Sequence, residues 1–291
     1  MLLGALEAGG TKMVCSTGDE TGQIFSRESF PTTTPEETMP ALINFFQRAG
    51  VEALGIGCFG PLDLKRNAPT YGFITSTPKE RWRNYPLYAT LQKALGVPME
   101  IDTDVNAAAL GEYVLGAAKG LSSCLYVTVG TGVGGGLVVE NQLVHGLVHP
   151  EFGHFFIQSH PDDPAPEGFC PYHKSCVEGL CNGPSIEKRW GEKAQLLPPE
   201  HPAWALEAYY LAQMCMTAIL IISPEKIILG GGVMQQEHLF PLVRQQTRDM
   251  LGGYVQHPAI LEEMDTYIVP PGLGQTSGVT GALLLAARAV R

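Results

Sequence analysis

Positive charge is scarce in this sequence. The 291 residues include 19 Lys and Arg against 29 Asp and Glu, which gives a formal net charge of −10 at pH 7. The densest basic stretch, residues 79–83, is short and is interrupted by Glu80 and Trp82. Because proteins that bind nucleic acids carry clustered cations that offset the phosphate charge, this composition argues against a nucleic-acid partner.

Long apolar runs and a disulfide framework are also missing. The most apolar stretch, residues 208–223, contains Gln213 and follows Glu207, so we expect a buried core helix there and no membrane span. No signal peptide is visible, because Glu7 comes soon after Met1. The seven cysteines are an odd number, and four of them lie inside apolar segments: Cys15, Cys58, Cys124 and Cys215. This pattern predicts reduced, buried thiols in a cytoplasmic protein.

The order of apolar segments predicts an α/β protein made of two similar halves. In the first half we expect strands at residues 2–6, 13–17, 23–30, 53–59 and 97–102, and helices at 35–48, with Thr34 as N-cap, and at 105–115. In the second half we expect strands at 123–129, 137–140, 226–229 and 266–269, and helices at 204–222 and 277–290. Each half opens with a strand–glycine turn–strand hairpin, which is typical of a duplicated α/β unit with a boundary near 116–120.

A closed metal site is predicted between residues 151 and 178. Four residues there have suitable donors and spacing: His154, Cys170, His173 and Cys176. Four nitrogen and sulfur donors fill a tetrahedral zinc ion and leave no position for water, so the zinc would be structural. Three further candidates lie nearby, namely His149, His160 and Cys181, of which the last two fit a polar loop and an apolar helix better.

Two carboxylates flank the predicted metal ligands. Glu151 precedes His154 by three residues, and Glu178 follows Cys176 by two. A metal ion that orders this segment would therefore hold two acceptors rigidly in one small volume. Such a pair is suited to binding the hydroxyl groups of a polyol.

Three glycine-rich turns could bind a nucleotide: the first two could hold its phosphate groups, and the third could let its base or ribose lie against the backbone. Residues 9–12 (G-G-T-K), 130–136 (G-T-G-V-G-G-G) and 230–232 (G-G-G) each follow a predicted strand. Glycine lets backbone N–H groups approach an anion closely, although any one of these segments alone could be an ordinary turn. The segment 9–12 is not a Walker A loop, which needs G-x4-G-K-[ST] between a strand and a helix, and it is not the dinucleotide-binding pattern, because no helix follows it directly.

Asp104 is the candidate general base. It lies where a predicted strand ends and a helix begins, and ligands of open α/β sheets bind at the carboxyl ends of strands. The alternative role is that Asp104 caps the helix. A carboxylate is suited to accepting the proton of an alcohol that attacks a phosphoryl group.

Together and in order, these segments resemble the ROK family of bacterial sugar kinases. The matching segments are residues 7–12 (E-A-G-G-T-K), 102–112 (D-T-D-V-N-A-A-A-L-G-E), 130–136, 151–178 and 229–232 (L-G-G-G). The sequences of these motifs are most similar to those of the family's fructokinase branch. The resemblance implies an actin/hexokinase-like (ribonuclease H-like) fold with a cleft between two α/β lobes, and a homodimer. It further implies Mg²⁺ with ATP, structural Zn²⁺ and transfer of phosphate to a hexose. The 6-hydroxyl of D-fructose is favoured, and glucose, mannose and N-acetylmannosamine are the alternatives.

The resemblance assigns roles residue by residue. Asp104 matches the base; Gly9, Gly10, Thr11 and Lys12 match the first phosphate motif; Gly130, Thr131 and Gly132 match the second; Gly230, Gly231 and Gly232 match the adenosine motif. Gly60, Thr77, Lys79, Thr103, Asp104, Glu151 and Glu178 match the sugar site. The implied lobes are residues 1–117, joined by the helix 276–291, and residues 118–275.

The sequence departs from the family pattern at three positions. Glu7 stands where many members have the Asp that helps to hold magnesium, and Thr103 stands where many have an Asn that contacts the sugar. His173 replaces a Cys, and both residues bind zinc. Two further functions are disfavoured. A sugar-responsive DNA-binding regulator would carry a DNA-binding segment ahead of the first phosphate strand, which begins at Leu2 here, and the negative charge also argues against it. A zinc hydrolase is disfavoured because the four protein donors fill the coordination sphere.

Overall fold

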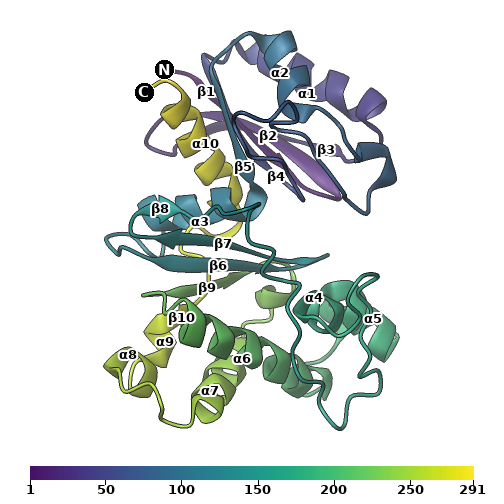
Figure 1. The fold of residues 1–291 in the computed structure, drawn as a ribbon, viewed down its shortest axis with the longest axis vertical. Helices are drawn as coiled ribbons and strands as arrows, with labels where there is room; N and C mark the ends of the chain where they lie inside the picture. Colours follow the sequence, from purple (N-terminus) through teal and green to yellow (C-terminus); the bar gives the residue numbers. More distant parts are fainter.

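Two five-stranded sheets of identical topology form the framework of the computed structural model, which describes residues 1–291 (Figure 1). The first sheet has the order β3-β2-β1-β4-β5, with β1 Leu3–Ala8, β2 Lys12–Gly18, β3 Ile24–Pro31, β4 Ala53–Cys58 and β5 Met99–Thr103. The second has the order β10-β9-β6-β7-β8, with β6 Cys124–Val129, β7 Val133–Val139, β8 Gln142–Leu143, β9 Ile227–Gly230 and β10 Ile268–Val269. In both sheets three antiparallel strands are extended by two parallel strands, so the predicted duplication is present in the topology.

Helices alternate with the sheets to give five layers (Figure 1). α1 (Pro35–Ala49) and α2 (Leu87–Leu95) cover the outer face of the first sheet. α3 (Asp104–Val114) and α10 (Ser277–Ala289) lie between the two sheets. α6 (Ala203–Ile221) and α7 (Leu239–Leu251) cover the outer face of the second sheet. The C-terminal helix therefore packs against strands from the beginning of the chain.

The alternation of side chains along the strands produces these layers. In β1, Leu6 and Ala8 pack in the cluster that contains residues of α1 and α2, while Leu3 and Ala5 pack against α10. In β6, Val127 faces the α6 side of the second sheet, and Tyr126 packs with residues of α3. The central strands β1, β4 and β6 are buried on both faces, which explains why they read as continuous apolar runs, whereas the edge strand β3 is mostly exposed.

The second glycine turn is shorter than the sequence predicts. β7 begins at Val133, so only residues 130–132 form the turn, and Gly134, Gly135 and Gly136 belong to the strand. The reason is the close approach of α3, because a Cβ atom on Gly136 would lie 2.0 Å from the carbonyl oxygen of Val105. Glycines that resemble a turn motif in the sequence serve here to pack a strand against a helix.

Glu112 organises the two segments that connect the sheets. Its buried carboxylate accepts hydrogen bonds from Ala117 N (2.8 Å), Gly272 N (2.9 Å), Leu273 N (3.0 Å) and Ser277 Oγ (2.7 Å). One donor lies in the connection that follows α3, and the other three lie at and before the start of α10. A single side chain at the end of α3 therefore holds both connections together.

Several shorter elements were not predicted. They are α2, α4 (Val177–Cys181), α5 (Gly183–Trp190), α8 (Pro258–Leu261) and the short strand β8, with 3₁₀ turns η1 (Glu80–Trp82), η2 (Ala194–Leu196), η3 (Val233–Gln235) and η4 (Gly274–Thr276). The helix α7 was expected after the third glycine turn, but without bounds. Of the predicted strand at 266–269, the first two residues belong to the helix α9 (Met264–Tyr267), and Ile268 and Val269 pair as β10. Thr34 precedes α1 as predicted, but its side chain forms no capping hydrogen bond.

The apolar helix α6 is a core helix. Its 19 residues are long and apolar enough to cross a membrane, but 67% of the most apolar window is buried inside the protein. It packs with α7 against the second sheet. The helix is therefore explained by the core that it completes, as predicted for residues 208–223.

Candidate active site

The strand register brings three functional segments to one edge of the first sheet. Ala8 is paired with Cys58, and Cys58 is paired with Thr103, so β1, β4 and β5 end side by side. The residues that follow these ends are the first glycine turn, the 59–60 segment and Asp104. The carboxyl ends of parallel strands are where open α/β sheets bind ligands.

Asp104 is not needed to cap α3. Thr103 is the N-cap residue, and its Oγ1 accepts the hydrogen bond from Asn106 N at 3.0 Å. Asp104 is the first helical residue, and its Oδ1 accepts from Val105 N at 2.9 Å. Burial raises the pKa of Asp104 from 3.8 to about 6. A carboxylate with this pKa, whose helix is capped by another side chain, has the properties of a general base.

Four carboxylates converge on this position. Burial, together with the charges of Glu178 and Asp104, raises the pKa of Glu151 to about 7. Burial followed by the charge of Asp104 also raises the pKa of Glu7. Like charges held this close favour the protonated form or a bound cation, so this cluster can bind hydroxyl groups or a divalent metal.

The first glycine turn joins β1 to β2. Gly9 N donates to Lys12 O at 3.0 Å, which closes the turn. Thr32, which follows β3, fixes the turn from outside: its Oγ1 donates to Gly9 O at 2.7 Å and its backbone N–H to Thr11 O at 3.0 Å. Thr11 and Lys12 are exposed, so their donors are free to meet an anion.

The second glycine turn is connected to the predicted sugar site. Gly130 N donates to Gly132 O at 2.9 Å to close the turn. Asn182 Nδ2 donates to Thr131 O at 3.0 Å, and Val133 N donates to Glu178 Oε2 at 3.0 Å. One predicted sugar ligand, Glu178, is thus bonded directly to the second phosphate turn.

The third glycine turn lies beside the second. Strand β9 runs parallel to β6, with Gly230 opposite Thr128, so residues 230–232 leave the sheet next to residues 130–132. Gly231 has a φ of 90°, and a Cβ atom there would lie 2.4 Å from Val129 O. Only glycine fits this position, which leaves a bare backbone surface beside the second turn.

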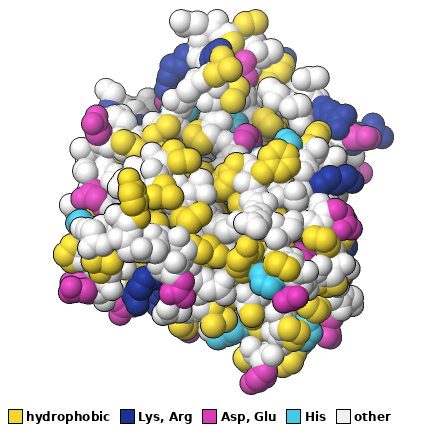
Figure 2. All heavy atoms as spheres, turned by 60° about the horizontal axis from the view of Figure 1, so that its bottom comes forward, with side chains coloured by type: hydrophobic (Ala, Val, Ile, Leu, Met, Phe, Trp, Pro, Cys, Tyr) yellow, Lys and Arg dark blue, Asp and Glu magenta, His cyan; other side chains and the backbone are white.

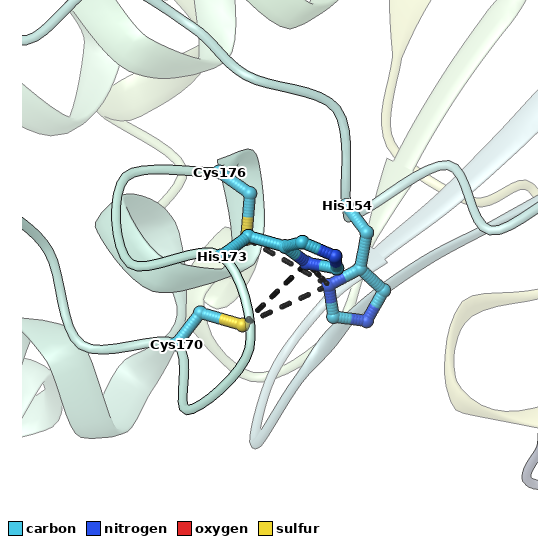
Figure 3. Close-up of side chains that lie close together, drawn as sticks. All are labelled: His154, Cys170, His173 and Cys176. Carbon is cyan, nitrogen blue, oxygen red and sulfur yellow. Dashed lines mark hydrogen bonds between the residues drawn. The ribbon is translucent and has the colours of Figure 1, made fainter. Parts of the chain in front are cut away.

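The four predicted metal ligands come together (Figure 3). Their donor atoms all lie within 4.8 Å of one another. His154 Nδ1 lies 3.3 Å from His173 Nδ1, 3.9 Å from Cys170 Sγ and 3.7 Å from Cys176 Sγ. A tetrahedral zinc ion with ordinary bond lengths separates its ligands by about 3.4 Å between two nitrogens and about 3.6 Å between nitrogen and sulfur. The arrangement therefore fits a closed zinc site, and the rejected candidates His160 and Cys181 are not in it.

Histidine side chains connect the zinc ligands and the carboxylates. His154 turns Nδ1 to the cluster, and its Nε2 lies 3.9 Å from Glu178 Oε1. His149 Nε2 accepts from Leu62 N at 2.9 Å, and its Nδ1 lies 3.6 Å from Glu151 Oε1. Burial lowers the pKa of His149, so its neutral ring presents Nδ1–H to Glu151. His149 therefore lies beside a predicted sugar ligand, at a distance longer than a hydrogen bond.

The remaining predicted sugar ligands have different surroundings. Gly60 lies at the sheet edge beside the His149 ring. Thr77 is buried, and its Oγ1 accepts from Lys79 N at 3.3 Å. The Thr103 hydroxyl oxygen already serves the helix cap. Direct contacts of these residues with a sugar stay predictions.

A polar network behind the base was missed in the sequence. Asp102 Oδ1 accepts from Asn106 Nδ2 at 2.8 Å, and its Oδ2 lies 2.8 Å from His145 Nε2. The hydrogen bond with Asp102 raises the pKa of His145. Asn106 Oδ1 in turn accepts from Leu137 N at 3.2 Å, which links the base-carrying turn to β7. A cavity of about 300 Å³ lies next to this network, between residues 61–65 and 145–148.

The duplicated sheets, with a glycine turn in each hairpin and a carboxylate at the strand ends, define an actin-like ATPase fold. The ROK family profile matches residues 3–289, and the chain belongs to the ROK family.

Relatives cover the chain from end to end. A fructokinase from Pediococcus pentosaceus is 45% identical over 291 residues, which cover 100% of this chain and 99% of the relative. A fructokinase from Zymomonas mobilis is 43% identical over 293 residues, with coverage of 98% and 96%. The crystal structure of a ROK family glucokinase from Streptomyces griseus, in complex with glucose and AMPPNP, superposes with a TM-score of 0.77. It is 25% identical and covers 99% of this chain and 100% of that one.

Proposed function

We propose that this protein is an ATP-dependent fructokinase that phosphorylates the 6-hydroxyl of D-fructose. The observation that carries the proposal is the position of Asp104: a base with a raised pKa, free of the capping role, at a sheet edge with a glycine turn beside it. The full-length similarity to proteins named fructokinase supports fructose as the acceptor. A kinase structure with glucose and a nucleotide analogue supports the same pair of ligand classes.

The transfer uses the carboxylate cluster and the glycine turns together. Asp104 accepts the proton of the sugar hydroxyl as its oxygen attacks the γ-phosphorus of ATP. Glu151 and Glu178 accept hydrogen bonds from other sugar hydroxyls and fix the orientation of the ring. The backbone N–H groups of residues 9–12 and 130–132 that do not close the turns bind the phosphates, and residues 230–232 face the adenosine.

Magnesium binding is proposed at Glu7. Its carboxylate lies near that of Asp104, as the effect of the Asp104 charge on the pKa of Glu7 indicates, and hard cations prefer oxygen ligands. When bound, Mg²⁺ would neutralise charge on the nucleotide phosphates. Glu7 lies in β1 at the position where many members of the family have Asp, and its longer side chain can still offer a carboxylate to Mg²⁺.

Zinc is proposed as a structural ion held by His154, Cys170, His173 and Cys176. The donor separations support this assignment. Four protein donors leave no open coordination position, so the ion orders the segment that carries the sugar ligands. Metal analysis of the purified protein tests the assignment.

A coupled ADP-release assay over a panel of hexoses tests the activity. Fructose is expected to give the highest kcat/KM, above glucose, mannose and N-acetylmannosamine. A preference for one of those sugars would refute fructose but retain the hexose kinase assignment. Absence of turnover with every hexose would refute the kinase.

A homodimer in the cytoplasm is proposed as the state of the protein. Large apolar side chains are exposed at the end of α6 and on α7, including Ile221 at 78%, Leu220 at 50% and Leu242 at 39%. Figure 2 shows hydrophobic side chains gathered across the middle of the face that includes this end of the molecule. Light scattering of the wild type and Ile221→Asp tests the surface, and a monomeric wild type would refute the dimer.

The division into two lobes is also a proposal. Residues 1–117 with 276–291 would move against residues 118–275 when sugar and nucleotide bind. The hydrogen bonds that Glu112 forms with both connections support a pivot at this side chain. Small-angle scattering with and without fructose and an ATP analogue tests the movement.

A further inference from the structure

The side chain of Lys79 lies over the first glycine turn. A Cβ atom placed on Gly10 would stand 3.2 Å from Lys79 Cε, so the ammonium group, one bond further along, is next to this turn. Lys79 is half-buried, and it takes part in none of the ion pairs of the protein. A partly buried cation without a carboxylate partner is a ready ligand for an anion.

Residues 32 and 33, which follow β3, hold both the loop that carries Lys79 and the first glycine turn. Trp82 is buried and donates from Nε1 to Thr33 O at 2.8 Å. Thr32, which precedes Thr33 in the chain, donates from Oγ1 to Gly9 O and from its backbone N–H to Thr11 O of the turn. The lysine and the turn are therefore held in a fixed relationship by neighbouring residues, as a preorganised anion site requires.

Other polar groups of this loop are used to hold its shape. Arg83 Nε donates to Thr77 O at 2.8 Å, and Lys79 N donates to Thr77 Oγ1 at 3.3 Å. These bonds fix the backbone of the loop. The ammonium group of Lys79 remains available to a ligand.

We propose that Lys79 binds the γ-phosphoryl group of the nucleotide during transfer, and that it is not a ligand of the sugar ring. The proposal rests on the proposed kinase function. β1 and β5 are both neighbours of β4, so their ends are separated by about 10 Å, twice the spacing of adjacent strands. A phosphoryl group that moves toward a hydroxyl held by Asp104 passes between Gly10 and Asp104. The ammonium of Lys79 borders this path.

The bonds and charges in this step balance. The sugar oxygen forms a bond to the γ-phosphorus as the bond from that phosphorus to the β–γ bridging oxygen breaks, and ADP leaves with the electron pair. The hydroxyl proton goes to Asp104. Lys79 keeps its own proton throughout, and its positive charge offsets the negative charge on the phosphoryl oxygens, which stabilises the transition state.

Replacement of Lys79 by Met tests this role. Lys79→Met is expected to lower kcat about 10²-fold, the usual effect of removing one preorganised donor, with little change in the KM for fructose. It should weaken binding of a non-hydrolysable ATP analogue about tenfold but leave ADP binding unchanged, because only the analogue carries a γ-phosphate. Lys79→Arg should recover most of the activity. Arg81→Met is the matched control, because Arg81 is an exposed cation of the same segment, and it should behave like the wild type.

Three results would overturn the proposal. The first is weaker fructose binding by Lys79→Met in nucleotide-free protein, with the preference for the ATP analogue over ADP retained, which would make Lys79 a sugar ligand. The second is no change in any of these constants. The third is an equal loss in Arg81→Met, which would reduce the effect to general charge. If the wild type phosphorylated no hexose, the kinase proposal would fail, while the comparison of ATP analogue with ADP would still decide the role of Lys79. Lys79→Gln replaces the Met variant if the latter does not fold.

Discussion

Glu178 Oε2 accepts a hydrogen bond from Val133 N at 3.0 Å, and this bond joins the proposed zinc segment to the second glycine turn. The other oxygen of the same carboxylate lies 3.9 Å from Nε2 of His154, whose Nδ1 faces the other donors of the cluster. The carboxylate therefore stands between the proposed metal site and a proposed phosphate site. Loss of the metal should therefore weaken the binding of sugar and nucleotide before it destabilises the fold.

Removal of zinc is expected to weaken fructose binding before it unfolds the protein. The ion would hold the segment that carries both Glu151 and Glu178, and loss of support around a site commonly costs about 10- to 100-fold in function. The measurement is fructose affinity by calorimetry in chelator-treated protein whose circular dichroism is still native. Restoration by added zinc is the control.

Two ligand variants separate zinc loss from general damage. Cys176→Ser removes a buried donor and should lose zinc and sugar affinity together. His173→Cys keeps four zinc donors and should retain both. Unchanged sugar affinity in folded, zinc-free protein would contradict the proposed link.

Asp104→Asn should abolish most turnover and spare sugar binding. The amide is isosteric but cannot accept the hydroxyl proton, and positioned general bases contribute about 10²–10⁴-fold. The measurements are kcat and fructose affinity, with Asp162→Asn as an exposed control, because that side chain is 92% accessible. Near-normal kcat in Asp104→Asn would show that another group is the base.

The pH dependence of turnover follows from the pKa of Asp104. Burial raises this pKa from 3.8 to about 6, and the base acts only when ionised, so kcat/KM should fall about tenfold per pH unit below pH 6. An unperturbed Asp would keep activity down to about pH 4. A profile of kcat/KM that is flat between pH 5 and 8 would argue against an Asp104 with a raised pKa.

The same pKa predicts that Asp104 reduces stability at neutral pH. Between pH 3.8 and about 6 the folded state holds a proton that the unfolded state has released, so the free energy of unfolding falls as pH rises through this window. Asp104→Asn removes the penalty and should stabilise the protein above pH 6, by at most about 3 kcal/mol, and have little effect below pH 4. Urea denaturation at pH 4 and pH 7.5 compares the two variants, and equal differences at both pH values would contradict this account.

The apolar patterning was sufficient to predict the duplicated α/β architecture. Strands buried on both faces read as continuous apolar runs, and each hairpin is marked by a glycine turn, so all five strands of the first sheet and four of the five in the second were predicted. The glycines of β7 were misread because a turn and a strand packed against a helix both require small residues. The position of Val105 against Gly136, which decides between them, is a tertiary fact.

The residue types and spacing were sufficient to find the proposed zinc ligands but not to assign the helix cap. Thr103 and Asp104 are both good N-cap residues, and only the backbone conformation at the start of α3 decides that Thr103 serves. The bond between Asp102 and His145 spans 43 residues, and no local pattern signals it. Lys79 was assigned to the sugar by resemblance, and its position over Gly10 depends on the contacts of a distant loop.

Glu112→Gln is expected to destabilise the protein strongly. The carboxylate is fully buried and accepts four hydrogen bonds from both connections between the sheets. The amide presents an NH₂ group to donors that would lose their acceptor, and unsatisfied buried donors opposite a lost charge cost about 2–4 kcal/mol. Glu225→Gln is the matched control, because Glu225 also accepts from several donors, Ser122 and Ser123, but is exposed, and its loss should cost less than about 1 kcal/mol. Urea denaturation measures both, and an equal effect of the two variants would show that Glu112 does not hold the connections together.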